Sequence, residues 1–377
     1  MRVLWVLPDA GPSDGARLAA WAIPVLVAGG AGVEVLPLKF QAHATWDWGV
    51  PVLESPLRGG FSRRLQLTGL LRRALSRYDR VVVDQDLDLE LAAAMARGRG
   101  ARAALVGVAH IPLTPLLAAR GEHQVAGLRQ AIARRYPLFD RWLAVSAGVG
   151  EDLVLAHRVP AGRVSVVPPP LPWPLWEAGA GAGPPPDWPF RDGLPVVATL
   201  GHLDHLKGVA VLLQALKVLE DRGRGLNLVV LGDGPERPAL EQLARSLGLR
   251  AFFAGWRPER ELARWLACCQ IYVAPQYFDG AALDVWTAMG QGLPVVATDG
   301  PTAPSEVLGR GRYGRVVALG EPMALVEEIE RWLDEPKRWE DTALKGYQRA
   351  RGYAAERVAS EWWKALGLRA GGSAGQA

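Results

Sequence analysis

The chain of 377 residues is too long for a typical single domain, so two domains are expected. Its hydrophobic fraction of 49% and charged fraction of 22% exclude a disordered chain and are typical of a globular protein with a packed core. The net charge of +4 comes without a recognised nucleic-acid-binding motif, which argues against nucleic acid as a partner.

The first half of the sequence alternates short β-branched runs with longer helical patterns. Strands are predicted over residues 3–7, 33–37, 80–83, 104–108, 142–145 and 164–167. Helices are predicted between them, for example over residues 16–28 and 69–76. This alternation indicates βαβ units and a parallel sheet.

Residues 171–193 break the pattern, because they are dense in Pro, Gly and Trp, and an interdomain linker is predicted over 173–192. A second alternation follows. Its strands are predicted at 195–199, 227–231, 251–254, 271–274 and 294–297, and its helices at 209–222, 235–247, 258–267, 282–291, 323–333 and 339–363.

The fold class is therefore α/β, with two Rossmann-like, doubly wound parallel-sheet domains over residues 1–172 and 193–350 that face a central cleft. A helix within 351–368 is expected to return to the N-terminal domain, and residues 369–377 are expected to be a disordered tail. The apolar start of the chain breaks at Pro8, too early for a signal peptide, and no apolar run reaches the roughly 18 residues of a spanning helix. A cytoplasmic protein is expected.

The segment GHLDHLKG (residues 201–208) follows a predicted strand and opens a helix. Glycines at both ends let backbone amides approach an anion, and the Lys207 ammonium suits a phosphate. An ordinary glycine-bounded turn with a solvated lysine would look the same. Two further turns end the next strands: GDGP from Gly232, and FAGW, where Trp256 either flanks a base or packs on the surface.

A third segment runs through residues 274–283 into a predicted helix that carries AMGQG. The small residues Gly280, Ala281 and Ala282, with Leu283, leave the amides at the helix start open to a ligand. Such amides form a good seat for a diphosphate.

In this order and spacing, the three segments resemble the family 4 retaining glycosyltransferases of the GT-B fold. The family carries Gly-Arg-Leu…Lys-Gly, Gly-Asp-Gly-Pro and Glu-Gly-Phe-Gly…Glu-Ala-Met…Gly-Pro-Val-Val elements. The similarity is strong over residues 200–298 and weaker over 144–152 and 164–168. It implies a hexosyltransferase-type enzyme that moves a sugar from a nucleotide-sugar to an acceptor with retention. Because no Asp-x-Asp cluster stands at a donor loop, catalysis without a metal ion or cofactor is predicted.

The resemblance also assigns residues. It implies that Lys207 holds the donor diphosphate and that His110 lies close to the transferred sugar, although a core histidine at 110 is nearly as common an outcome. The catalytic candidates are His110, Lys207 and Asp279. The donor-binding candidates are Gly11, Gly15, Gly201, His202, Gly232, Trp256, Gly280, Ala281, Ala282, Leu283 and Thr287.

Three of these positions depart from the family pattern. His202 replaces the phosphate-binding Arg, Asp279 replaces the first Glu of the Glu-x7-Glu pair, and Thr287 replaces the ribose-binding second Glu. A catalytically decayed GT-B scaffold protein is therefore an alternative, and a sugar-nucleotide epimerase is another. We favour the transferase because Lys207 and the glycine loops persist.

The remaining features bear on partners, metals and the core. Residues 58–80 form a basic amphipathic stretch. This stretch suits either peripheral contact with an anionic membrane and a lipid acceptor, or a core-packed helix with a solvated Arg face. A second basic patch at Arg129, Arg134 and Arg135 gives the membrane alternative some support. A saccharide acceptor is equally open. Asp84-Gln85-Asp86 is predicted to be a polar cleft edge, not a metal site, and the adjacent Cys268 and Cys269 are expected in the core.

Overall fold

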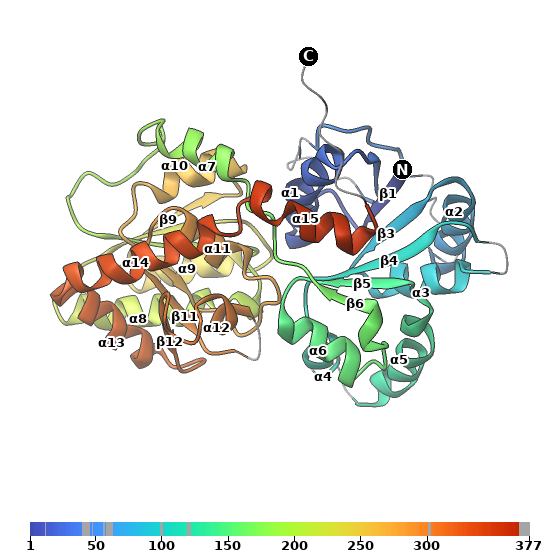
Figure 1. The fold of residues 1–377 in the computed structure, drawn as a ribbon. Coiled ribbons are helices and arrows are strands. Elements are labelled where there is room, and N and C mark those ends of the chain that lie inside the picture. The colour runs from blue at the N-terminus through green and yellow to red at the C-terminus, as the bar shows by residue number, and fades with distance from the viewer. Residues whose placement is uncertain are drawn as a thin grey trace, which may run out of the picture. The chain divides into compact units, whose positions relative to one another are not determined.

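The computed structural model describes residues 1–11, 13–39, 46, 48–55, 57, 63–98, 101–118, 122–300 and 303–368. The chain forms two compact units (Figure 1). The N-terminal unit contains Met1–Pro170 and the C-terminal helix α15 (Ala355–Leu366), and the C-terminal unit is Leu171–Ala354. The predicted tail, 369–377, lies outside the described residues.

The N-terminal unit is built on a six-stranded parallel sheet in the order β2-β1-β3-β4-β5-β6. The strands are β1 (Arg2–Leu7), β2 (Gly32–Pro37), β3 (Arg80–Asp84), β4 (Ala104–Ala109), β5 (Arg141–Ala144) and β6 (Val164–Val166). The helices are α1 (Asp14–Ala28), α2 (Arg63–Arg77), α3 (Leu87–Ala96), α4 (Leu113–Ala118), α5 (Glu122–Arg135) and α6 (Ala147–Leu155). The winding direction reverses between β1 and β3, and ligands bind in such folds outside the carboxyl ends of the strands at this point.

Helix α15 completes the N-terminal unit by packing on α1. Trp362 is fully buried, stacks on Trp5 with ring centroids 6.4 Å apart, and donates its indole N–H to the Pro168 carbonyl. The Trp363 indole donates to the Val25 carbonyl at 2.7 Å. These two tryptophans explain why the end of the chain belongs to the first unit, since burying such rings contributes strongly to stability.

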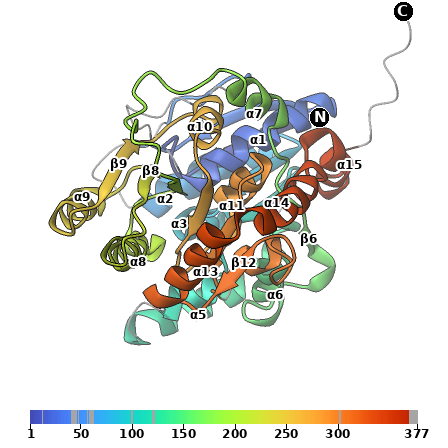
Figure 2. The same ribbon diagram turned by 90° about the vertical axis from the view of Figure 1, so that its left-hand side faces the viewer.

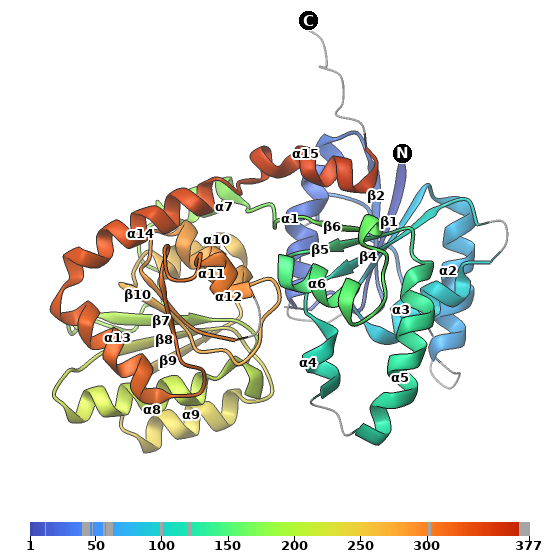
Figure 3. The same ribbon diagram turned by 60° about the horizontal axis from the view of Figure 1, so that its bottom comes forward.

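The C-terminal unit has its own six-stranded parallel sheet, in the order β12-β11-β10-β7-β8-β9. The strands are β7 (Val196–Leu200), β8 (Asn227–Leu231), β9 (Arg250–Gly255), β10 (Ile271–Ala274), β11 (Val295–Thr298) and β12 (Arg315–Val317). The helices are α7 (Trp173–Ala180), α8 (Val209–Asp221), α9 (Arg237–Ser246), α10 (Glu259–Leu266), α11 (Leu283–Gly290), α12 (Ala303–Val307), α13 (Pro322–Asp334) and α14 (Pro336–Arg351). Figures 2 and 3 show α8 and α9 together along one face of this sheet, with α10 and α11 on the other. Here the winding reverses between β7 and β10.

The predicted linker, 173–192, is not a separate segment without regular structure. Its first part is the helix α7, which packs on α10 within the C-terminal unit. Trp176 of this helix is 1% exposed, donates to the Glu259 carboxylate at 3.0 Å, and fills space that a side chain at Gly290 would need. Burial of the tryptophan outweighs the poor helix propensity of the flanking Pro and Gly residues.

The end of the C-terminal unit differs from the prediction in two further places. The helical segment predicted over 339–363 is divided at Gly352 into α14 and α15, which belong to different units. The edge strand β12 has three residues, too few to produce a readable alternation in the sequence.

The core of the N-terminal unit contains a buried carboxyl group. Glu90 is fully buried, accepts a hydrogen bond from the Tyr136 hydroxyl, and leaves Oε1 without a partner among the described residues. Burial, with smaller contributions from Asp86 and Asp84, raises the pKa of Glu90 to about 8. The group is therefore a neutral acid over most of the physiological range.

We expect the Glu90→Gln variant to remove a pH dependence of stability. The folded-state pKa of about 8 lies above the 4.5 of an exposed glutamate. The wild type is therefore most stable, as far as Glu90 is concerned, below pH 4.5, and it loses this stability as the pH rises towards 8. Over this pH range, the free energy of unfolding of the variant rises by about 5 kcal/mol relative to that of the wild type. Urea unfolding at several pH values measures the difference. Glu327→Gln, at an exposed ion pair, is the control, and a pH-independent difference for Glu90→Gln would contradict the prediction.

Candidate functional site

The candidate site of the C-terminal unit lies at the carboxyl ends of β7 and β10, where the winding of the sheet reverses. Lys207 ends the short turn after β7 and is 8% exposed. Asp204 caps this turn, since its side chain accepts from the Lys207 backbone N–H at 3.0 Å. The turn therefore fixes a buried ammonium at the start of α8.

The Lys207 ammonium is paired with Asp284, in the first turn of α11. Lys207 Nζ also donates to Gln276 Oε1 at 3.1 Å, and the Tyr272 hydroxyl donates to Asp284 Oδ2 at 2.8 Å. Burial alone would raise the pKa of Asp284, but Lys207 and the hydrogen bonds outweigh it and the pKa is lowered. Burial and the neighbouring Asp284 raise the pKa of Tyr272, which stays a hydroxyl donor. The pair is thus buried, and both of its partners make further hydrogen bonds.

Two of the amides expected to seat a diphosphate, those of Ala281 and Ala282, are already engaged. Asp279 Oδ1 accepts from the N–H groups of Ala281 and Ala282 at 3.1 and 2.8 Å, and its other oxygen accepts from Gln276 at 3.0 Å. Ala282 adopts a left-handed conformation, with φ of 46°, and α11 begins at the next residue. Gly280, Ala281, Ala282 and Leu283 are all buried. The N–H groups of Ala281 and Ala282, which precede α11, are therefore not open as expected, because Asp279 accepts from both.

The glycines of the motifs are required for close backbone packing. A side chain at Gly232, where φ is +148°, would come within 1.9 Å of the Gly201 carbonyl oxygen. One at Gly201, where φ is +140°, would come within 2.8 Å of Lys207 Nζ. The two glycine loops are thus in close contact beside Lys207. The motifs alone do not reveal this structural role of the glycines.

Three other predicted donor-binding residues lie in different environments. His202 is exposed after β7, and Trp256 is half-buried after β9. Thr287 is fully buried, and its hydroxyl donates to the Leu283 carbonyl at 2.7 Å. The Thr287 hydroxyl, at the position expected to bind a ribose, therefore donates to the backbone of its own helix.

The N-terminal unit has a second group of candidates at the carboxyl ends of β3 and β4. His110 Nε2 is hydrogen-bonded to Asp84 Oδ1, both side chains are buried, and the Trp5 indole donates to Asp84 Oδ2 at 3.1 Å. His110 Nδ1 is buried without a partner among the described residues. Burial disfavours the imidazolium, but the carboxylate of Asp84, with Asp14, outweighs this and raises the pKa of His110. Gly15 lies against the pair, since a side chain there would meet Asp84 Oδ1 at 2.7 Å.

The Asp84-Gln85-Asp86 motif, predicted to be a polar cleft edge, also positions His110. Gln85 Oε1 accepts from the backbone N–H groups of His110 and Ile111 at 2.6 and 2.8 Å, and Asp86 caps α3. The Gly11 amide, expected near the diphosphate, donates to Asp9 Oδ1 at 2.8 Å. Within the described residues, no three His, Cys, Asp or Glu side chains are grouped to hold a metal ion.

A segment of the C-terminal unit matches a known protein family. Residues 194–335 match the family described as Glycosyl transferases group 1. The C-terminal unit therefore contains a group 1 glycosyltransferase domain.

Curated relatives of this glycosyltransferase domain carry sugar-transfer names. A 2-deoxystreptamine glucosyltransferase from Streptomyces kanamyceticus is 29% identical over 148 residues, which are 39% of this chain and 38% of that protein. A D-inositol 3-phosphate glycosyltransferase from Nocardia farcinica is 27% identical over 267 residues, 66% of this chain and 58% of that protein. The matched segments thus span roughly two fifths to three fifths of these relatives.

Solved structures confirm the GT-B fold for the whole chain. Anabaena HepE in complex with UDP and glucose has a TM-score of 0.79 at 17% identity, covering 98% of this chain and 100% of that one. Sucrose-phosphate synthase from Thermosynechococcus elongatus has a TM-score of 0.77 at 16% identity, covering 97% and 98%. At such identities the similarity establishes the fold alone.

Two residues next to the glycosyltransferase candidates were not assigned a role from sequence. Asp284 stands 77 positions from Lys207, and an acidic residue in the first turn of a helix is common without any distant partner. Gln276 follows a buried strand, and nothing in its neighbours marks its amide as the link between Lys207 and Asp279. Only the three-dimensional contact identifies either residue.

We expect Asp84→Asn to lower the pKa of His110, because burial then acts without the opposing carboxylate. NMR titration of the imidazole resonances, with His110→Gln for assignment, gives the value. Asp152→Asn, beside His157 at 3.2 Å, is the matched control and leaves the His110 pKa unchanged. An unchanged His110 pKa in Asp84→Asn would show that the pair does not control the ring.

We expect Asp284→Asn to destabilise the fold by about 3–5 kcal/mol, the usual cost of leaving one buried charge of a pair uncompensated. Denaturant unfolding measures the loss. Asp221→Asn breaks the exposed Lys217–Asp221 pair and costs less than about 1 kcal/mol. Equal losses in the two variants would mean that the Lys207–Asp284 pair is not buried in solution.

Proposed function

We propose that the chain is a retaining glycosyltransferase that moves a sugar from a nucleotide-sugar donor to a saccharide or lipid-linked acceptor without a metal ion. The observation that carries the proposal is the buried ammonium of Lys207 at the reversal point of the C-terminal sheet, beside the start of α11. A cation held in such a place suits the diphosphate of a nucleotide. HepE, with the same fold, was solved with UDP and glucose bound.

In the proposed reaction, Lys207 neutralises charge on the departing nucleoside diphosphate. The bond from the sugar C1 to the phosphate oxygen breaks, and a bond from C1 to the acceptor oxygen forms on the same face. The acceptor proton passes to the leaving phosphate, so no protein nucleophile is required. His110, a donor held by Asp84, is proposed to hydrogen-bond the transferred sugar.

Donor binding must then loosen the existing contacts of the site. The diphosphate competes with Asp284 for Lys207, and with Asp279 for the amides of Ala281 and Ala282. This competition offsets part of the binding free energy, because each ion pair or cap must be exchanged for a phosphate contact. The exposed His202 stands where the family pattern has an arginine, which would carry a fixed positive charge. The alternative of a catalytically decayed scaffold rests on the same two points, the competition with Asp284 and Asp279 and the lack of an arginine at position 202.

The acceptor and its location are part of the proposal. Helix α2 presents the exposed Arg72, Arg73 and Arg77 over buried leucines, which supports peripheral contact with an anionic membrane. Arg63 and Arg64 are paired with Asp86 and Asp88 of the same unit, which reduces the charge left for lipid. Arg58 lies outside the described residues. No helix among the described residues is long and apolar enough to cross a bilayer.

The test combines thermal shift with nucleotide release for a panel of UDP-, GDP-, ADP- and TDP-sugars. The control is the double variant Lys207→Gln/Asp284→Asn, which removes both buried charges and keeps the shape of the pair. We expect one nucleotide to stabilise the wild type, by about 2.7 kcal/mol at 100 times its Kd, and not the double variant. We also expect release of nucleoside diphosphate, unchanged by a metal chelator, on addition of a free oligosaccharide or a glycolipid in anionic vesicles.

The outcomes separate the alternatives. Stabilisation by a nucleotide without release, with either acceptor, supports the decayed scaffold. Conversion of the donor to its epimer without release supports the epimerase. No stabilisation by any nucleotide in a folded sample overturns the donor site itself, and loss of release on chelation overturns the metal-free mechanism.

A further inference from the structure

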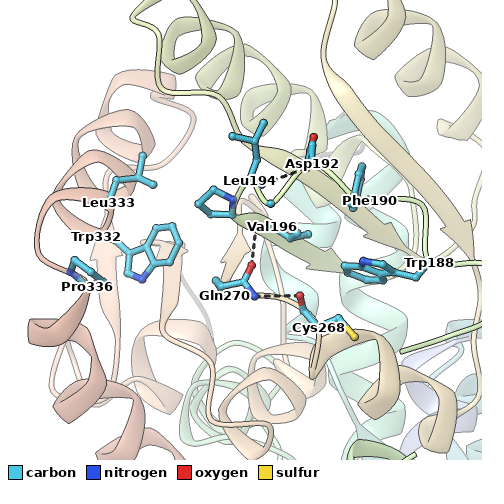
Figure 4. A pocket seen from close by; sticks show the side chains of 12 residues that line it. Trp188, Phe190, Asp192, Leu194, Val196, Cys268, Gln270, Trp332, Leu333 and Pro336 are labelled. Carbon is cyan, nitrogen blue, oxygen red and sulfur yellow. Dashed lines mark hydrogen bonds between the residues drawn. The ribbon is translucent and has the colours of Figure 1, made fainter. Parts of the chain in front are cut away.

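A cavity of about 470 Å³ lies at the amino ends of β7 and β10, within the C-terminal unit (Figure 4). Its walls are the segment leading into β7, the turn before β10, and the junction between α13 and α14. Lys207 and α11 follow the carboxyl ends of these strands, so the cavity is separated from the candidate donor site by the length of the sheet, roughly 15 Å. Its volume is in the usual range for small-molecule sites.

Aromatic rings line the cavity and are already fixed by packing. Trp188 and Phe190 are half-buried and meet edge to face with ring centroids 5.7 Å apart. Trp188 also packs on Trp265 at 5.4 Å, and Trp332 is 7% exposed and belongs to the core. Figure 4 shows Trp332 and Trp188 on opposite sides of the cavity, with Gln270 between them. No rearrangement of the rings is needed to offer an apolar face to a ligand.

Two polar side chains at the cavity are also fixed. The Asp192 carboxylate accepts from the Asn227 side chain at 2.7 Å and from the Leu194 N–H at 3.1 Å, and the Asn227 bond in particular lowers the pKa of Asp192. Gln270 accepts from the Val196 N–H at 2.8 Å and donates to the Cys268 carbonyl at 3.1 Å. Both side chains are exposed. The cavity wall therefore combines apolar rings with an ionised carboxylate and an oriented amide.

We propose that this cavity is a binding site for a neutral saccharide unit, separate from the donor site. A pyranose has a flat face of C–H groups, which packs on an indole ring, and a rim of hydroxyls, which hydrogen-bond to carboxylate and amide groups. The lining residues include Asp192 and no Lys, Arg or His, so a phosphorylated sugar or nucleotide would meet a negative charge in the cavity wall. Arg250 acts on Asp192 from outside the lining, but it is paired with Glu220. A purely apolar ligand would displace water from Asp192 and Gln270 without replacing its hydrogen bonds.

The site goes beyond the proposed transfer reaction, and its occupancy does not depend on the donor. Saturation-transfer difference NMR with neutral trisaccharides (maltotriose, cellotriose and mannotriose) tests it, with glucose 6-phosphate and cyclohexanol as comparison ligands. We expect signal from at least one trisaccharide in the wild type and in Lys207→Gln/Asp284→Asn, and none from glucose 6-phosphate. We expect Trp188→Ala to weaken binding by about tenfold.

The controls keep the test independent of folding and of the donor site. Tyr347→Ala removes an aromatic side chain, 36% exposed, elsewhere on the same unit and leaves binding unchanged. Phe190→Leu replaces a ring with an apolar side chain of similar size and weakens binding even if Trp188→Ala does not fold. The proposal is overturned if no trisaccharide binds, if cyclohexanol alone binds, if Phe190→Leu binds as the wild type does, or if the charge-neutral double variant loses the signal.

Discussion

The buried ion pair between Lys207 and Asp284 is the constraint on which the candidate donor site depends. It joins the turn after β7 to the first turn of α11, and Tyr272 and Gln276 complete its hydrogen bonds. A buried charge is tolerated only when it is paired and hydrogen-bonded, so the surrounding backbone must approach closely. The glycine at 201 is part of the same arrangement, because any side chain there would meet the ammonium.

The same pairing gives a physical account of the departures from the family pattern. An unpaired lysine together with an arginine would give a strongly positive seat, whereas Lys207 with Asp284 is neutral overall. His202 is exposed, and Asp279 accepts from the amides of Ala281 and Ala282 just before α11, so these two amides and the charge of Lys207 already have partners. In the proposed reaction, a donor binds by exchanging these contacts, and its affinity depends on how much more favourable the phosphate contacts are than those of the two carboxylates.

The fold was largely predictable because burial of parallel strands leaves β-branched runs that alternate with helical periods. The helix α7 was not, because its stability comes from burying Trp176 against α10 and α11 and not from its own residues. The site was predictable where a motif is local, as at Lys207. Its partner Asp284 and the link between Asp84 and His110 were not, since these contacts join elements distant in sequence. The periodicity of a sequence carries no information about such pairs.

The C-terminal unit therefore has two chemically different ends on one sheet. At the carboxyl ends of the strands, the reversal of winding brings together the Lys207–Asp284 pair and the amides that Asp279 occupies, where a phosphate would replace the carboxylates. At the amino ends, loops rich in Pro and Trp cover the strand starts and leave aromatic rings beside Asp192, which is unsuited to an anion. In the two proposals, a phosphate binds at one end of the sheet and a neutral saccharide at the other, so a nucleotide and a saccharide occupy the same domain without competing.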